Sequence, residues 1–242
     1  MMELLTDPAV WASFVTLTIM EVVLGIDNIV FISIVVGKLP PDQAERARKL
    51  GLLLALVFRI VLLLFLTWII GLKEELFTLF DHSFSWRDII LIAGGAFLLY
   101  KGTAEIHEEI EGGTEEESAR RHASNAFAAI IFQIIIIDLV FSVDSIGTAI
   151  GMAEHVEVMI AAVVVAVAIM FVASGPIADF IRRHPTIKML ALAFLILIGV
   201  SLVADGLGFH IPRGYIYAAM GFSVLVEAIN IMVSRRRKKA AK

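Results

Sequence analysis

The sequence predicts an all-α, polytopic membrane protein with seven transmembrane helices, built as a 3+3 inverted repeat followed by a seventh helix. Of its 242 residues, 59% are hydrophobic and the mean hydropathy is +0.89, well above the values of an ordinary globular domain. The apolar residues form long runs, and about 20 such residues are enough to cross the hydrocarbon core of a bilayer. Two of these runs carry the same pattern of acidic residues, which predicts the repeat.

Seven stretches are predicted as spans, and together they form one transmembrane domain over residues 1–242. They cover residues 9–37, 50–72, 86–105, 126–152, 158–181, 188–205 and 215–233. The third is the least apolar, but Lys101 near its end can extend its amine to the membrane surface. The first repeat is expected over 9–105 and the second over 124–205, with a solvated acidic loop at 106–123 and a basic tail at 234–242. The N-terminus lacks the basic start and cleavage site of a signal peptide, so the first stretch is expected to remain in the mature protein.

The distribution of Lys and Arg predicts the orientation of the chain in the membrane. Sixteen of the 20 Lys and Arg residues fall in the tail and in the loops on one side. The other side holds only Lys73, Arg87 and Arg213, and Arg59 lies within the second span. By the positive-inside rule, the protein is expected in the cytoplasmic (inner) membrane with its N-terminus outside and its C-terminus in the cytoplasm.

The repeated acidic pattern is the strongest functional signal. Residues Glu21 to Asn28 read EVVLGIDN and residues Asp138 to Ser145 read DLVFSVDS, so that each has a carboxylate, five residues, and then Asp with a small polar residue. A charged side chain at the bilayer centre costs at least about 2.5 kcal/mol, and such residues usually handle ions or protons. The motifs lie in the first and fourth spans, which cross in opposite directions. In transporters with inverted repeats, ions bind near the midplane where the two halves meet.

Counting from the span ends gives an expected depth for each acid. Glu21, Asp138 and Glu227 fall near the bilayer centre, whereas Asp27 lies about 9 Å nearer the cytoplasm and Asp144 a similar distance nearer the outside. Arg59 falls at the depth of Asp27 and is therefore expected to be its counter-ion.

The available side chains select the chemistry of the predicted site. There is no Cys, and all six His residues lie in loops or at span ends, so that soft metals lack their preferred ligands within the spans. Carboxylate, amide and hydroxyl oxygens suit Mn²⁺, Mg²⁺ or Ca²⁺. A buried carboxylate cluster without metal is expected to take up protons, which favours exchange of a dication for protons. The candidate metal ligands are Glu21, Asp27, Asn28, Asp138, Asp144, Ser145 and Glu227.

Several of these strings resemble the TerC family of bacterial integral membrane proteins. They include LTIMEVVLGIDNIVFIS, GGAFLLYKGTAEIHE, FQIIIIDLVFSVDSIGTAIGM and FSVLVEAIN, and the likeness extends from the first span to the seventh. The family is grouped with the lysine-exporter superfamily; it was first tied to tellurium resistance, and several relatives are manganese efflux proteins. The resemblance implies export of Mn²⁺ or a similar ion, with the family's acidic motifs falling on Glu21, Asp27, Asn28, Asp138, Asp144 and Ser145. The chain resembles the short, membrane-only subgroup, which has no added soluble domain.

Other interpretations stay open. The buried acids could serve only as hydrogen bonds or ion pairs between helices, and Glu227 with Asn230 could form a packing contact. Asp27 and Asp144 could form the catalytic pair of an intramembrane aspartyl protease, although the GxGD and YD motifs of that class are missing. A scaffold for membrane assembly or stress complexes is the third class, and it would not need midplane carboxylates. We expect no enzyme activity, no prosthetic group and no nucleic-acid partner; the expected partners are the lipid bilayer and the transported metal ion.

Overall fold

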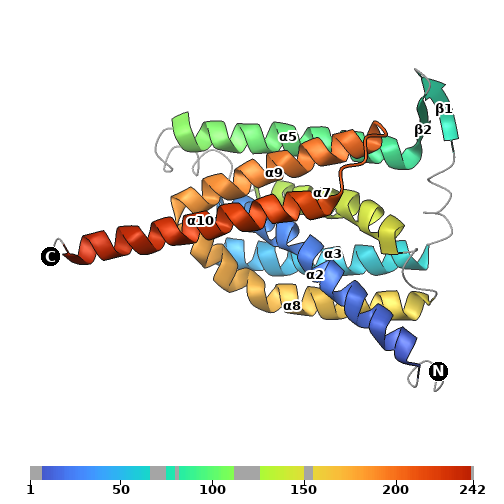
Figure 1. Cartoon of the computed structure of the whole chain (residues 1–242), viewed down its shortest axis with the longest axis horizontal. Coiled ribbons are helices and arrows are strands. Elements are labelled where there is room, and N and C mark those ends of the chain that lie inside the picture. The colour runs from blue at the N-terminus through green and yellow to red at the C-terminus, as the bar shows by residue number, and fades with distance from the viewer. Residues whose placement is uncertain (1–6, 66–74, 80–81, 112–125, 150–154, 241–242) are drawn as a thin grey trace.

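The computed structural model describes residues 7–65, 75–79, 82–111, 126–149 and 155–240, and long α-helices form nearly all of these residues (Figure 1). The helices of these residues are α2 (Pro8–Val36), α3 (Pro41–Leu64), α5 (Trp86–Glu111), α7 (Ala126–Ala149), α8 (Val156–Arg183), α9 (Pro185–Gly206) and α10 (Arg213–Ala240). The short strands β1 (Glu75–Leu79) and β2 (His82–Ser85) pair in an antiparallel hairpin before α5. The predicted all-α membrane fold is confirmed.

Within the described residues, six helices are long and apolar enough to cross a membrane, and α3 is the exception. Its first half is polar and includes Asp42 and Lys49, and only the part after Leu50 is continuously apolar apart from Arg59. The predicted second span continues to residue 72, and residues 66–72 lie outside the described part of the chain.

Local signals explain where several helices begin. Asp7 accepts a hydrogen bond from the backbone amide of Ala9 at 2.8 Å and so caps α2. Proline stands in the first turn of α3 and of α9, where its missing amide proton has no helical partner to lose.

The structure corrects two boundaries. Helix α5 continues to Glu111, so that the start of the predicted solvated loop is helical, and Glu105 is buried against Lys38 at 2.8 Å. Helix α10 continues to Ala240 through most of the predicted basic tail. A helix can continue through polar residues beyond the membrane, because water solvates their side chains there. The rest of the acidic segment, residues 112–125, lies outside the described residues.

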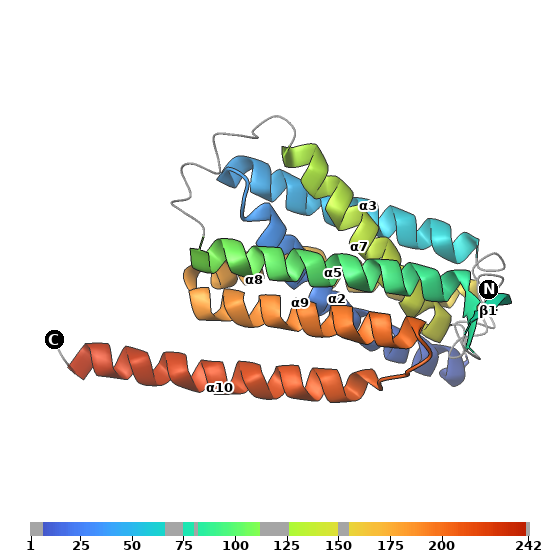
Figure 2. The same ribbon diagram turned by 90° about the horizontal axis from the view of Figure 1, so that it is seen from above.

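The helices alternate in direction, and α2 and α7 therefore run opposite to each other (Figure 2). The most extensive helix pairs are α5 with α9 and α2 with α8, followed by α3 with α7. In the predicted repeat, α2 corresponds to α7, α3 to α8 and α5 to α9. Exchanging each helix for its counterpart converts the α2–α8 pair into the α7–α3 pair and leaves the α5–α9 pair unchanged. An inverted repeat would produce these pairings, and the repeat itself stays a prediction.

Glycines allow α5 and α9 to touch through their backbones. A Cβ atom added at Gly95 would lie 2.6 Å from the carbonyl oxygen of Gly199, and one added at Gly199 would lie 2.9 Å from the carbonyl oxygen of Gly95. Small residues are the usual means by which helices pack closely in lipid, where the hydrophobic effect does not favour one apolar contact over another.

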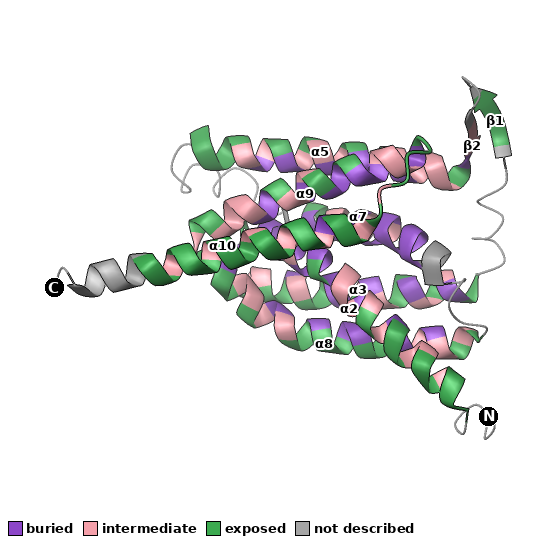
Figure 3. Ribbon diagram, in the orientation of Figure 1, coloured by how far each residue is buried: buried purple, intermediate pink, exposed green. Residues whose placement is uncertain are grey.

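Helix α10 lies along the outside of the bundle and packs mainly on α9 (Figure 2). None of its most apolar window is buried in the chain. Buried residues concentrate instead on the inward faces of helices such as α2, α7 and α9 (Figure 3). The exposed apolar side chains of α10 are therefore suited to lipid contact.

The glycine contact gives a test of the α5–α9 packing. Gly95→Val places side-chain atoms where the backbone of α9 lies, so we expect a loss of about 1–3 kcal/mol of stability from overpacking. Gly221→Val on α10 is the matched control, because a Cβ at Gly221 meets nothing within 4 Å. The measurement is the thermal unfolding midpoint of each variant in detergent. Equal midpoints for the two variants would contradict the close contact.

Candidate functional site

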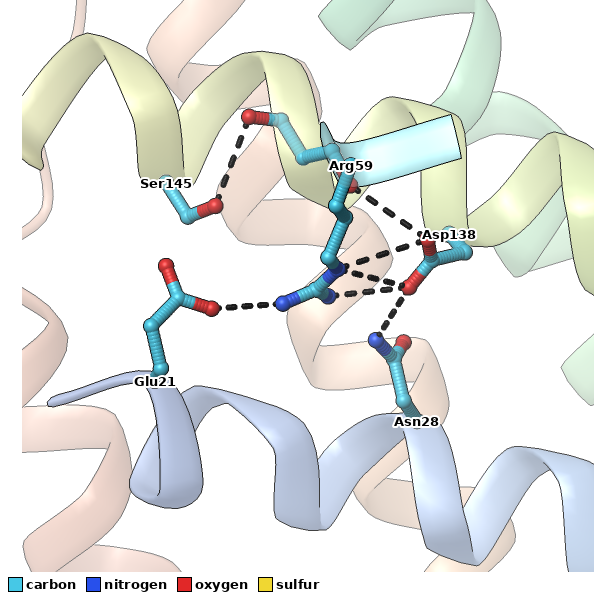
Figure 4. A network of polar contacts seen from close by, with 6 residues as sticks. Glu21, Asn28, Arg59, Asp138 and Ser145 are labelled. Atoms are coloured by element: carbon cyan, nitrogen blue, oxygen red, sulfur yellow. Dashed lines mark hydrogen bonds and ion pairs between the residues drawn. The ribbon is translucent and has the colours of Figure 1, made fainter. Parts of the chain in front are cut away.

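Four buried polar side chains from three helices meet in the interior of the bundle (Figure 4). Glu21 and Asn28 come from α2, Arg59 from α3 and Asp138 from α7; we call them the Arg59 cluster. Their exposed fractions lie between 2% for Arg59 and 5% for Asn28. The sequence places these groups inside the protein because each stands within an apolar run whose neighbours pack in the core.

Arg59 joins the two carboxylates of this cluster. Its Nη1 donates to Glu21 Oε2 at 2.5 Å, and its Nη2 donates to Asp138 Oδ1 at 2.9 Å. Asp138 is further held by the side-chain amide of Asn28 at 2.9 Å and by the hydroxyl of Ser142 at 3.4 Å. Two carboxylates and one guanidinium leave an excess negative charge in a region of low dielectric, and such a group of oxygens attracts a cation.

A second group of charges, the Arg213 cluster, contains Asp27, Arg87, Asp144 and Arg213. Asp144 accepts a hydrogen bond from Arg87 Nη2 at 2.9 Å and forms an ion pair with Arg213. Asp27 and Arg213 line the same small cavity, together with Ser201 and Tyr217 among others. Its volume of about 10 Å³ is close to what one water molecule needs. Among the described residues, Asp27 Oδ1 and Ser201 Oγ have no hydrogen-bond partner, so both can bind a further ligand or water.

The first and second acids of each repeated motif therefore lie in different clusters. The first acids, Glu21 and Asp138, share Arg59, whereas the second acids, Asp27 and Asp144, lie beside Arg213. The prediction that Arg59 is the counter-ion of Asp27 is therefore wrong. Depth counted along the sequence failed because α2 crosses the bundle obliquely (Figure 1), so that residues of equal count do not lie at equal height. Counting along the sequence also placed Asp27 and Asp144 at opposite depths, whereas the structure brings both of them beside Arg213.

Of the two remaining predicted ligands, Ser145 lies beside Glu21 of the Arg59 cluster and Glu227 lies elsewhere. Ser145 is buried on α7, and its hydroxyl donates to the carbonyl oxygen of Ser142 at 3.3 Å (Figure 4). Glu227 accepts hydrogen bonds from Thr186 at 2.5 Å and from Asn230 at 3.3 Å. Thr186 is the second residue of α9, about 22 Å along that helix from Ser201, which lines the cavity beside Arg213. Glu227 therefore lies near an end of the bundle, apart from both clusters.

In the part of the chain that the structure describes, no three His, Cys, Asp or Glu side chains are grouped so that they could hold a metal ion. Five of the seven predicted ligands are instead distributed over two clusters that each contain arginine. Metal binding by these residues stays a prediction, and it would have to use carboxylates that arginines contact in this structure.

Sequence analysis did not identify Arg87 and Arg213, or Ser201 and Tyr217 of the neighbouring cavity, as parts of a site. Arg87 and Arg213 stand at the ends of predicted spans and were assigned to loops. A signal was nevertheless present, since only three cations were assigned to the outer side and a buried acid needs a counter-ion. The arrangement also argues against the protease alternative. Asp144 contacts two arginines, whereas a catalytic aspartate pair has to share a proton.

Ion pairs also link side chains at the end of the bundle where α5 ends and α9 begins. Lys38 contacts Glu105 at 2.8 Å and Glu108 at 2.6 Å, and Lys188 contacts Glu109. Burial of the Lys38 amine lowers its pKa, but the hydrogen bonds and charges of the two glutamates outweigh this effect and leave the pKa above its ordinary value. Since the pKa of Lys38 is raised, the charge of its amine contributes stability at neutral pH, and this contribution is lost as the pH rises through that pKa in alkaline solution.

Comparison with known proteins defines the class to which this fold and these clusters belong. The family model described as "Integral membrane protein TerC family" matches residues 6–242. The chain belongs to the TerC family of integral membrane proteins, which confirms the resemblance identified in the sequence.

Particular relatives are similar over nearly the whole chain. The UPF0053 inner membrane protein YoaE of Escherichia coli K12 is 50% identical over 235 residues, which are 97% of this chain and 45% of YoaE. A UPF0053 protein of Haemophilus influenzae is 51% identical over 238 residues, 98% of this chain and 100% of its own length. The inner membrane protein YgdQ of E. coli K12 is 48% identical over 232 residues, 96% and 97% of the two chains.

The chain thus spans about half the length of YoaE and nearly all of the other two. No solved structure matches it. The inner-membrane names of YoaE and YgdQ agree with the six apolar helices, and the chain is an integral membrane protein. The orientation of its termini stays a prediction.

The Arg213 cluster gives a stability prediction. Asp144→Asn removes the charge that compensates Arg87 and Arg213, and breaking one partner of a largely buried ion pair costs about 3 kcal/mol. Asp179→Asn is the matched control, because Asp179 is 55% exposed and pairs with Arg182 on the surface; we expect a loss below about 1 kcal/mol. Thermal unfolding in detergent measures both effects. An Asp144→Asn variant as stable as the Asp179→Asn variant would show that the buried ion pairs do not hold the bundle together.

Proposed function

We propose that the protein is a secondary transporter that exports a hard divalent metal ion, with Mn²⁺ as the expected ion, in exchange for protons. The observation that carries this proposal is the pair of buried carboxylates, Glu21 and Asp138. They come from two helices of opposite direction and point at the same enclosed cation, Arg59. Two acids held together in an apolar bundle are costly, and their usual use in membrane proteins is to handle ions.

The chemistry of the surrounding groups supports a hard cation. Glu21 and Asp138 supply carboxylate oxygens, and Asn28 and Ser142 supply an amide and a hydroxyl that already contact Asp138. Oxygen ligands of this kind suit Mn²⁺, Mg²⁺ and Ca²⁺. The chain has no Cys to favour a softer metal. The implied manganese efflux activity of TerC relatives agrees with this choice.

The Arg213 cluster is proposed as the next position on the exit path. Asp27 follows Glu21 on α2 by six residues and has one oxygen without a partner in a cavity near Arg213. Arg213 begins α10 at the end of the bundle that charge counting predicts to be outside. On α7, which is predicted to run outward, Asp144 follows Asp138 by six residues and pairs with Arg213. A cation that leaves Glu21 and Asp138 in that direction would therefore meet the carboxylate of Asp144.

Exchange for protons follows from charge balance. The two carboxylates cannot remain fully charged in a low dielectric once the dication leaves, and Arg59 compensates only one of them. A proton supplies the remaining positive charge. A scaffold protein would have no need of these ionisable groups, so metal transport by the purified protein distinguishes the two functions.

Neutral replacements of the acids test the transport proposal. Glu21→Gln, Asp27→Asn and Asp138→Asn keep the side-chain shape and remove the negative charge, and each is expected to lower Mn²⁺ export at least about 100-fold, in line with losses from changed metal sites. Asp179→Asn, on an exposed surface, is expected to transport as the unchanged protein does. The measurement is Mn²⁺ flux in proteoliposomes. Unimpaired export by the Glu21 and Asp138 variants would refute the assignment of the site.

The pH dependence of metal binding tests the exchange. If protons and Mn²⁺ compete for the same carboxylates, then Mn²⁺ affinity must weaken as the pH falls from about 8 to about 5, the window in which a buried carboxylate cluster is expected to titrate. A pH-sensitive dye should also report acidification of the compartment that Mn²⁺ leaves. Affinity that is constant across this range, without proton movement, would instead indicate a channel or a uniporter.

A further inference from the structure

Arg59 is enclosed among the groups that would bind the metal. Only 2% of the residue is exposed, and three of its nitrogens donate to the two carboxylates. Nη1 contacts Glu21, while Nε and Nη2 both contact Asp138, at 3.2 and 2.9 Å from its Oδ1. The guanidinium therefore fills the space between the two acids (Figure 4).

The charge of this side chain is permanent. An arginine keeps its proton under all conditions that proteins meet, so it cannot leave the site by becoming neutral. Oxygens bind Mn²⁺ or Mg²⁺ at about 2.0–2.2 Å, a distance at which the ion would occupy the place of the guanidinium nitrogens. Glu21 Oε2 and Asp138 Oδ1 can thus contact Arg59 or a dication, but not both.

We propose that Arg59 is a tethered competitor of the transported dication. It balances one of the two carboxylates when the site holds no metal, and its guanidinium withdraws when the metal binds. This inference rests on the proposed function, because it requires a dication at Glu21 and Asp138. It adds to that function a residue that sets the affinity for the ion and reduces the number of protons that the empty site has to take up.

The competition has a functional purpose. A bare pair of buried carboxylates would bind a dication too tightly to release it, whereas a cation attached to α3 can return to the acids as the metal leaves. Because the guanidinium is covalently tethered, its local concentration at the acids does not depend on the solution. Release of the metal is thereby favoured on whichever side the site is open.

The test compares Mn²⁺ binding by the detergent-purified protein with that of Arg59→Gln and Arg59→Lys, by titration calorimetry and by the Mn²⁺-dependent shift of the unfolding midpoint. Removal of a competing unit charge at contact distance is expected to tighten Mn²⁺ binding by Arg59→Gln at least about tenfold. Mn²⁺ should also raise its midpoint more than that of the unchanged protein. Its export in proteoliposomes should slow, since only protons are then left to displace the metal. Arg182→Gln, on the exposed surface, is the control and should bind as the unchanged protein does.

Lysine keeps the charge but is a compact point donor that cannot bridge both acids as the guanidinium does. Arg59→Lys should therefore bind Mn²⁺ more tightly than the unchanged protein and less tightly than Arg59→Gln. If Arg59→Gln does not fold without metal, its recovery by Mn²⁺ supports the proposal, and the Arg59→Lys affinity decides it independently.

Unchanged or weaker Mn²⁺ binding by both Arg59 variants, while the unchanged protein binds the metal, would overturn the inference and leave the proposed transport intact. Absence of Mn²⁺ binding by the unchanged protein and by both variants would overturn the inference and the proposed metal transport together.

Discussion

The architecture depends on the ion pairs that Arg59 makes with Glu21 and Asp138. Apolar helices in lipid gain little from choosing one apolar neighbour over another, because lipid chains are as apolar as leucine. Buried charges impose that choice, since each has to find its partner or bear a large cost. Through Arg59, helix α3 is fixed to α2 and α7 at once. The backbone contact of Gly95 with Gly199 then places α5 and α9 at a short distance that larger side chains would not allow.

The two acids of each repeated motif belong to different clusters. Residues six apart on a helix point in directions about 120° apart, so the two acids of one motif cannot face the same partner. Each acid instead lies near the corresponding acid of the other motif, together with an arginine from a third helix: Arg59 from α3 or Arg213 from α10. The buried carboxylates are thus balanced by arginines of other helices and not by residues of their own helix. The bundle therefore holds two separate clusters of buried charge.

Much of this could be predicted from the sequence because lipid restricts the choices. The spans, the helical class and the placement of the acids inside the bundle follow from hydropathy and from the cost of charge in a membrane. Partner choice could not be predicted, because it depends on helix tilt: Arg59 was assigned to Asp27 and contacts Glu21 and Asp138. Tilt also displaced Glu227, which was expected at the centre and contacts Thr186 at the start of α9. Arg87 and Arg213 were missed because a cation at the end of a span looks the same in sequence whether it meets water or a buried acid.

The position of α10 gives the protein a sensitivity to its lipids. This helix presents its apolar surface outward and packs mainly on α9, yet Arg213 at its first turn is paired with the buried Asp144. A transmembrane helix adapts to a thicker or thinner bilayer by changing its tilt, at a modest energetic cost. Such a tilt of α10 moves Arg213 with it and so alters the electric field at Asp27 and Asp144. Acyl-chain length thus becomes a variable that acts on the buried charges from outside the bundle, without any soluble ligand.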